Sequence, residues 1–210
     1  MSDKLSGTKV KEFWEYMSQH YDTTVLQKNS DLSKILKLKD FSLDALKELG
    51  TEIYAVALFL DKLKVMDVGK FMNNYATTLG DRIYIPFEPG KKNKNYSLKK
   101  QMVICVHEHQ HVLQFRKEPF AFAIRYLADR AQRAMFEAEC YRCNMEIEYA
   151  LTGTMPKAEG YAKSLKNYAC TDEDIAVVEK ALKLSAQTIK AGGVTTKASG
   201  VALKWMTKNL

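Results

Sequence analysis

The chain has 210 residues, of which 46% are hydrophobic, and carries a formal net charge of +7. Its size and apolar content fit one domain with a full hydrophobic core, and four Pro and ten Gly argue against long disordered or collagen-like stretches. Four cysteines are few for a disulfide scaffold of this length, and the longest apolar run, residues 54–60, is too short to cross a bilayer.

The first residues contain no apolar segment of the kind that directs secretion. We therefore expect a cytoplasmic protein without a membrane partner, and delivery as part of a larger particle is compatible with the same features. Lysines concentrate in residues 90–95 and at Lys99 and Lys100, which we interpret as a solvated loop and a first helical turn. A nucleic acid or an acidic partner is the alternative interpretation of this basic cluster.

Helices dominate the expected N-terminal part of the chain, because apolar residues recur there every three to four positions. They are predicted over residues 9–21, 42–49, 52–66 and 68–78. Residues 53–56 also fit a short strand, and Gly50 and Gly80 stand where two of these helices should end.

Residues 81–87 are the best strand candidate, because β-branched and aromatic side chains follow a glycine there. Pro86 within this run indicates an edge strand or the end of a strand. Further helices are predicted over residues 97–113, 120–151 and 171–190. An interruption near Ala128-Asp129 is the alternative to one continuous helix up to Gly153, and residues 194–210 suggest a short docking element.

The segment HEHQH at residues 107–111 is an HExxH motif. An α-helix turns about 100° per residue, so His107 and His111 project within roughly 40° of each other, with Glu108 beside them. This arrangement lets two imidazoles hold one Zn²⁺ while a carboxylate faces the water that the metal activates. With only four His in the chain, a chance match is expected in about 0.5% of such sequences. The motif therefore predicts a zinc-dependent hydrolase.

The third zinc ligand has to come from elsewhere, because a catalytic zinc usually has three protein ligands and one open position. No histidine follows His111, and Lys117 stands where the motif HExxHxxGxxH requires its last histidine. His109 points roughly 160° away from His111 on the same helix, and His20 lies far upstream. We therefore expect a carboxylate or a thiolate as the third ligand.

The segment RAMFEAECYRC offers both kinds of ligand. Here the chain resembles the gluzincin-type metallopeptidases, whose second active-site helix carries a Glu ligand, then a small and a polar residue. Glu137 as the ligand, with Cys140 as the small residue and Tyr141 at the polar position, fits this pattern. Glu139 is the alternative ligand, although it would put the bulky Arg142 at the small position. The family usually has Asp or Asn where Tyr141 stands, so the role of Tyr141 departs from the family pattern.

The resemblance covers about residues 80–145 and implies peptide hydrolysis with Glu108 as the general base. In this family an edge strand upstream of the motif binds an extended substrate, which assigns that role to Ile83, Tyr84 and Ile85. The groups that stabilise the oxyanion or orient a ligand are then expected among Tyr126, Tyr141 and Arg142.

Three other interpretations use the same residues. Cys140 and Cys143 with His107 and His111 would form a closed Cys₂His₂ structural zinc site in a basic binding module without catalytic activity. The three histidines of HEHQH would share one face if the segment were a strand. The same segment would also be compatible with a polar helix that binds no metal.

The predicted fold is α+β and predominantly helical, a zincin-like domain with an active-site helix, a second ligand helix and a small sheet that contains an edge strand. Residues 1–80 are expected to form an N-terminal helical region, residues 81–155 the catalytic core and residues 156–210 a C-terminal helical region, together in one compact domain. The predicted function is hydrolysis of protein or peptide substrates with one Zn²⁺ as the cofactor.

Overall fold

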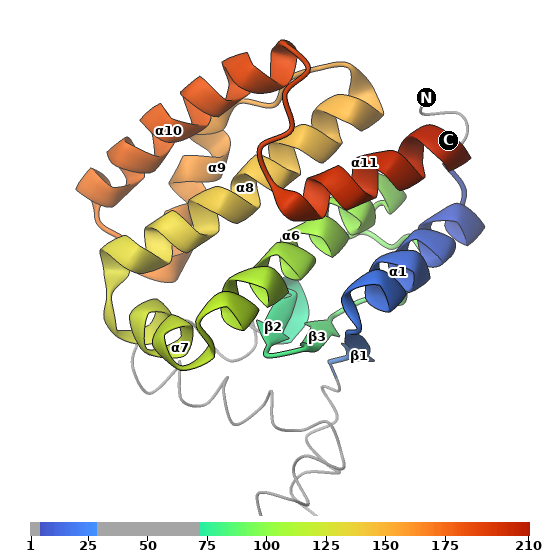
Figure 1. Ribbon diagram of the computed structural model, residues 1–210, viewed down its shortest axis with the longest axis horizontal. Coiled ribbons are helices and arrows are strands. Elements are labelled where there is room, and N and C mark those ends of the chain that lie inside the picture. The colour runs from blue at the N-terminus through green and yellow to red at the C-terminus, as the bar shows by residue number, and fades with distance from the viewer. Residues whose placement is uncertain (1–4, 29–71) are drawn as a thin grey trace, which may run out of the picture.

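The computed structural model describes residues 5–28 and 72–210, and this part of the chain is mainly helical with one small sheet (Figure 1). The predominantly helical α+β class is therefore confirmed. The helices predicted over residues 42–49 and 52–66 lie outside the described residues. Among the described helices, none combines the length and the apolarity that crossing a membrane would need.

The predicted N-terminal helix is confirmed as α1 (Gly7–Tyr21). It begins after Ser6, whose hydroxyl accepts a hydrogen bond from the backbone N–H of Lys9. One face of α1 is buried, and it consists of the apolar positions that the periodicity predicted: Val10, Phe13, Trp14, Met17 and Tyr21.

The sheet has three short strands, which are β1 (Thr24–Gln27), β2 (Thr77–Leu79) and β3 (Arg82–Ile85). Their order is β1-β3-β2, with β1 parallel to β3 and β2 antiparallel to it. The predicted edge strand is therefore wrong, because Ile83, Tyr84 and Ile85 belong to the central strand of the described sheet. All three side chains are fully buried, so β3 is covered on both faces, and Pro86 marks the end of the strand and not an edge.

The helix predicted over residues 68–78 is wrong at its C-terminal end. In the described part of the chain, helical backbone reaches residue 74, and Thr77–Leu79 form β2. The β-branched side chains of Thr77 and Thr78 suit a strand. Gly80 adopts a φ of +63°, which allows the tight turn from β2 into β3.

Two long helices form the centre of the fold: α6 (Leu98–Lys117) and α8 (Arg130–Thr152). The shorter α7 (Pro119–Ala128) connects them. The interruption predicted near Ala128-Asp129 is confirmed, because Asp129 leaves the helical conformation and its carboxylate accepts a hydrogen bond from the backbone N–H of Gln132. Gly153 ends α8 in the left-handed conformation, as predicted.

The C-terminal part contains four further helices: α9 (Ala158–Ser164), the 3₁₀ helix η2 (Leu165–Tyr168), α10 (Asp172–Lys190) and α11 (Lys197–Asn209). The helix predicted over residues 171–190 is confirmed as α10, and a capping box between Thr171 and Asp174 begins it. The docking element predicted in residues 194–210 is confirmed as α11. α9 and η2 lie in the region expected to be helical, although neither was predicted as a separate helix.

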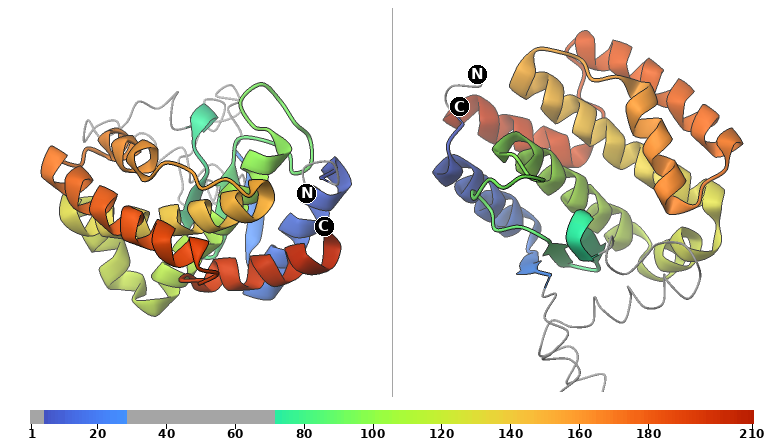
Figure 2. Two further views of the ribbon diagram at one scale, coloured as in Figure 1. Left: turned by 90° about the horizontal axis from the view of Figure 1, so that it is seen from above. Right: turned by 180° about the vertical axis from the view of Figure 1, so that it is seen from behind.

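The helix α6 lies between α8 and α1, and α11 contacts all three of these helices (Figure 1). One apolar cluster joins α1, β3, α6 and α11, and a second joins α8 to α9 and α10. Seen from behind, the sheet and α9 lie on the same side of the α6–α8 pair (Figure 2). The α6–α8 pair is therefore the layer on which the rest of the fold is built.

The carboxylate of Glu146 on α8 holds the segment that leads into α11. It is buried and accepts hydrogen bonds from the backbone N–H and the hydroxyl of Thr195, at 2.6 and 2.8 Å, and from the hydroxyl of Thr196 at 2.6 Å. Three such bonds satisfy a buried charge that would otherwise oppose folding.

We expect Glu146→Gln to lower the free energy of unfolding by about 1–3 kcal/mol, because an amide turns one acceptor into an N–H group that faces other donors. Chemical denaturation followed by circular dichroism measures this change. The same substitution at the exposed Glu15 of α1 should change the free energy of unfolding by less than about 0.5 kcal/mol. Equal losses at the two positions would contradict the role of Glu146.

Candidate metal centre

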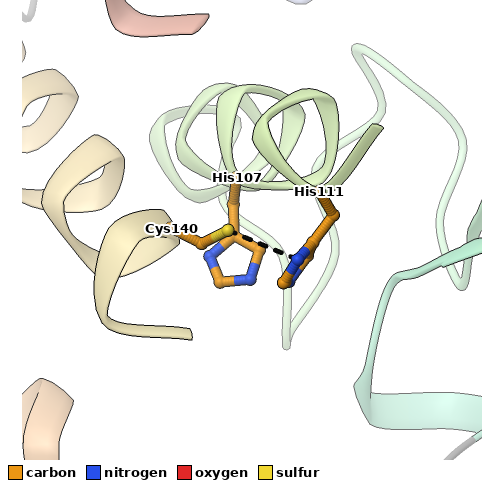
Figure 3. Close-up of side chains that lie close together, drawn as sticks. All are labelled: His107, His111 and Cys140. Atoms are coloured by element: carbon orange, nitrogen blue, oxygen red, sulfur yellow. Dashed lines mark hydrogen bonds between the residues drawn. The ribbon is translucent and has the colours of Figure 1, made fainter. Parts of the chain in front are cut away.

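The HEHQH segment lies within α6, so the interpretation as a strand is wrong. His107 and His111 project from α6 to the same side, and the centroids of their rings are 4.9 Å apart (Figure 3). The side chains are only 12% and 9% exposed. Two adjacent, largely buried imidazoles can serve as two of the ligands of a metal ion.

The helix α8 brings a carboxylate to both imidazoles. Oε1 of Glu137 lies 3.4 Å from Nε2 of His111, and Oε2 lies 3.6 Å from Nε2 of His107. The Glu137 side chain is 1% exposed. Contacts that pair low numbers on α6 with high numbers on α8, such as His107 with Asn144, show that the helices run antiparallel. Glu137 therefore reaches the histidines because the two helices cross at this level.

Hydrogen bonds on the far side of each ring orient the two imidazoles. Nδ1 of His111 lies 2.8 Å from Oε1 of Gln114, and Nδ1 of His107 lies 3.2 Å from Oδ1 of Asn144. An amide oxygen can only accept, so both Nδ1 atoms carry the hydrogen. Both Nε2 atoms then face the Glu137 carboxylate. A metal cation between these groups, or a proton on Nε2 of His111, would satisfy them.

The charges in this space are strongly coupled. Burial, together with the neighbouring His111, lowers the pKa of His107. Burial alone would also lower the pKa of His111, but the carboxylate of Glu137 raises it to about 9. Burial opposes ionisation of Glu137, yet the two imidazoles hold its pKa below the usual value. The buried carboxylate thus stays negative and attracts a positive charge to the site.

The nitrogen–oxygen distances of 3.4 Å (to Oε1) and 3.6 Å (to Oε2) are close to the separation of two ligand atoms in a tetrahedral zinc site. With bonds of about 2.0–2.1 Å, that separation is about 3.4 Å. In the described part of the chain, Oε2 of Glu137 is buried and has no hydrogen-bond donor. A buried carboxylate oxygen without a donor calls for an explanation, and a metal ion provides one.

A second group of potential ligands combines the same histidines with a thiol. His107, His111 and Cys140 each offer a ligand atom within 4.8 Å of the others. Sγ of Cys140 approaches His111 from the Nδ1 side, at 3.4 Å (Figure 3). That nitrogen is already bonded to Gln114, and burial raises the pKa of the Cys140 thiol well above its usual value. The structure thus offers two candidate groups around the same histidines, one with Cys140 and one with Glu137.

The structure does not bring the second cysteine of the Cys₂His₂ interpretation to this group. Sγ of Cys143 lies 3.1 Å from the hydroxyl of Thr196, next to α11. Burial raises the pKa of Cys143 to about 12, although the Thr196 hydroxyl opposes this shift. Cys143 is thus a buried thiol that packs between helices, as free cysteines often do.

The carboxylate of Glu108 lies beside the two histidines and is 5% exposed. The hydroxyl of Thr78 on β2 donates to Oε2 of Glu108 at 2.8 Å and lies 3.1 Å from the Glu108 backbone oxygen. Lys28, which follows β1, donates to Thr77 at 2.8 Å. Burial lowers the pKa of Lys28 to about 7, and the charge of Glu108 opposes this shift. The strand next to the predicted base is therefore β2, and not the segment Ile83–Ile85.

Glu139, the alternative third ligand, has other partners. Its carboxylate accepts hydrogen bonds from Nε2 of Gln110 at 3.1 Å and from Nε2 of Gln114 at 2.7 Å. Gln114 also donates to the backbone oxygen of Phe136 at 3.0 Å, which fixes the orientation of its amide. Glu139 is therefore linked by hydrogen bonds through Gln114 to the imidazole of His111, and it orients that ring indirectly.

Of the three groups expected to serve the oxyanion or a ligand, Tyr126 lies closest to the carboxylate. Its hydroxyl donates to Oε1 of Glu137 at 2.5 Å. The ring of Tyr141 lies 5.8 Å from the His107 ring, and its hydroxyl is hydrogen-bonded to Ser164 at 3.0 Å. Arg142 lies about 140° around α8 from Glu137, on a continuous helix, so its role remains a prediction.

Sequence reasoning missed Asn144, Thr78 and Tyr168. Asn144 follows Glu137 by seven residues, almost two full turns, and this spacing was the available signal. Thr78 lay in a segment predicted to be helical. Tyr168 belongs to η2; burial, with the charge of Glu137, raises its pKa well above the usual value. No pattern in the sequence connected Tyr168 with the motif.

The remaining histidines have no place in this group. His109 is fully buried on the opposite face of α6, where Nδ1 donates to the backbone oxygen of Cys105 at 2.7 Å and Nε2 accepts from Thr23 at 3.1 Å. Burial lowers its pKa to about 4, so it is a neutral structural residue. His20 is exposed on α1, and so are residues 91–95 of the basic cluster, which were expected to be solvated.

Comparison with protein-family models, with curated proteins and with solved structures finds no match, so the interpretation of this site rests on the geometry of its own residues.

Proposed function

We propose that this chain is a zinc-dependent peptidase of the zincin type, in which His107, His111 and Glu137 hold one Zn²⁺. The single observation that carries the proposal is that Nε2 of both histidines faces one buried carboxylate, at 3.4 and 3.6 Å. Two imidazoles and one carboxylate form a common ligand set of catalytic zinc, and they leave a fourth position open. The adjacent Glu108 supplies the group that a merely structural site would not need.

The zinc ion supplies a Lewis acid that polarises a carbonyl and makes water a nucleophile near neutral pH. Glu108 accepts a proton from that water and returns it to the leaving amine. Thr78 donates to one oxygen of the Glu108 carboxylate and so fixes its direction. Gln114 and Asn144 each bind Nδ1 of one histidine, which leaves Nε2 as the nitrogen that a metal would bind once it displaces any proton there.

The neighbouring strand suits an extended substrate. β2 contacts α6, carries Thr78, and has one partner strand in the described sheet. A peptide that adds to the other side of β2 would therefore run close to Glu108. This arrangement supports a protein or peptide as the substrate, with β2 in the role that the sequence had assigned to Ile83–Ile85.

Removal and return of zinc test this proposal. We expect hydrolysis of a mixed peptide library by the purified chain to stop after dialysis against a chelator and to recover with one equivalent of Zn²⁺. Circular dichroism before and after dialysis serves as the control for folding. Cleavage that continues at the same rate without metal would contradict the zinc mechanism.

A second candidate function is a binding module in which the metal only stabilises the fold. The close approach of the Cys140 thiol to His111 favours it, because sulfur ligands are typical of structural zinc. In that case the zinc-loaded protein would cleave none of the peptides.

A further inference from the structure

The two oxygens of the Glu137 carboxylate have different surroundings. Oε1 accepts a hydrogen bond of 2.5 Å from the hydroxyl of Tyr126 and lies 3.4 Å from Nε2 of His111. Oε2 lies 3.6 Å from Nε2 of His107 and has no hydrogen-bond donor among the described residues. A short bond from a phenol to a carboxylate is charge-assisted and draws electron density from the oxygen that accepts it. Oε1 is therefore the weaker of the two possible ligand atoms.

A buried guanidinium fixes the backbone that carries this phenol. Arg133 on α8 is 5% exposed, and its Nε donates to the backbone oxygen of Tyr126 at 2.6 Å. Its terminal nitrogens donate to the backbone oxygens of Leu127 at 3.0 Å and Tyr168 at 2.6 Å. One side chain thus ties the end of α7 and the end of η2 to the second ligand helix.

Aromatic contacts restrict the ring of Tyr126 as well. Its centroid lies 5.7 Å from that of Phe122, 6.0 Å from that of His111 and 6.5 Å from that of Phe136. The donor on Oε1 is therefore held in place from two sides.

We propose that Tyr126 is a positioning residue that occupies Oε1 of Glu137, so that the carboxylate offers a metal ion Oε2 alone, and that Arg133 holds Tyr126 in this place. The inference rests on the proposed function, because it concerns the same metal site. With two imidazoles and one water, a carboxylate that binds through one oxygen gives four ligand atoms, whereas one that binds through both oxygens gives five.

The visible absorption of bound Co²⁺ tests this inference without any measurement of activity, because four-coordinate cobalt absorbs more strongly than five- or six-coordinate cobalt. For Tyr126→Phe, which keeps the ring and removes the hydroxyl, we expect a clear loss of molar absorption while one equivalent of Co²⁺ still binds. Arg133→Lys, which cannot reach three carbonyls at once, should change the spectrum in the same direction. Tyr96→Phe is the matched control, because it removes another hydrogen bond of a buried tyrosine, to the backbone oxygen of Asn73.

The outcomes separate this inference from the proposed function. If folded Tyr126→Phe protein gives the same cobalt spectrum as the unsubstituted chain, the role of Tyr126 is refuted while the metal site stands. If Tyr96→Phe changes the spectrum as much as Tyr126→Phe does, the effect is not specific to the carboxylate and the inference also fails. If the unsubstituted chain binds no Co²⁺, or shows the intense near-ultraviolet band of a cobalt–thiolate bond, both proposals fall.

Discussion

Glu108→Gln should reduce the kcat of peptide hydrolysis by at least about 10²–10⁴-fold, the range that a positioned general base contributes. The amide has nearly the same shape as the carboxylate, and its oxygen can still accept the hydrogen bond from Thr78. It cannot accept a proton from water. Zinc content, measured by elemental analysis, and the melting temperature should therefore stay close to those of the unsubstituted chain.

Glu146→Gln is the matched control for this experiment. It makes the same change at another buried carboxylate, on α8, which accepts hydrogen bonds from Thr195 and Thr196 outside the metal site. We expect it to lower stability and to keep kcat, which is the opposite of the pattern for Glu108→Gln. A Glu108→Gln protein that cleaves peptides at an undiminished rate would remove Glu108 from the mechanism and leave only a metal-binding helix.

The local pattern of the sequence was sufficient to predict the helix that carries the motif. Apolar residues recur at helical spacing from Leu98 onward, and four residues separate His107 from His111, so the two imidazoles had to share one face. The break at Asp129 was equally local, because an aspartate there caps the next helix. Features of this kind depend on neighbours within one or two helical turns, which is why a single sequence can predict them.

Features that depend on distant segments were predicted less well. The place of β3 in the sheet depends on β1, more than fifty residues upstream, and no local pattern indicates that pairing. The resemblance placed a polar residue at Tyr141, whereas Asn144, one turn further along α8, contacts His107 in the structure. The sequence did not distinguish Glu137 from Glu139 as the third ligand. The packed helices do so, because Gln110 and Gln114 of α6 bind the carboxylate of Glu139.

Those glutamines also connect the candidate metal site with the rest of the fold. Gln110, which stands between His107 and His111 in the sequence, donates to Glu139. Its Oε1 accepts a hydrogen bond from the backbone N–H of Ala198 at 3.2 Å. The start of α11 is thus linked through Gln110, Glu139 and Gln114 to Nδ1 of His111. Groups that orient a metal ligand in this way typically change metal affinity or activity by about 10–100-fold when they are replaced.

Glu137→Gln should weaken zinc binding by more than about 100-fold, which exceeds the effect expected for groups that only orient a ligand. The substitution removes the negative charge that attracts the ion, while the amide oxygen can still accept the hydrogen bond from Tyr126. Competition with a chromophoric chelator measures the affinity directly. Circular dichroism should show a folded protein, because the loss concerns the ligand and not the packing of α8.

Cys140→Ala distinguishes the two possible ligand groups, because only the second group contains this thiol. With Glu137 as the ligand, we expect zinc affinity to stay within about tenfold of the original value, below the range for orienting groups. Cys143→Ala is the matched control, since it removes a buried thiol one turn away that belongs to neither group. The reverse pattern, with zinc lost from Cys140→Ala and retained by Glu137→Gln, would identify a sulfur-ligated site. It would also end the proposal of a peptidase, because that proposal depends on Glu137 as the third zinc ligand.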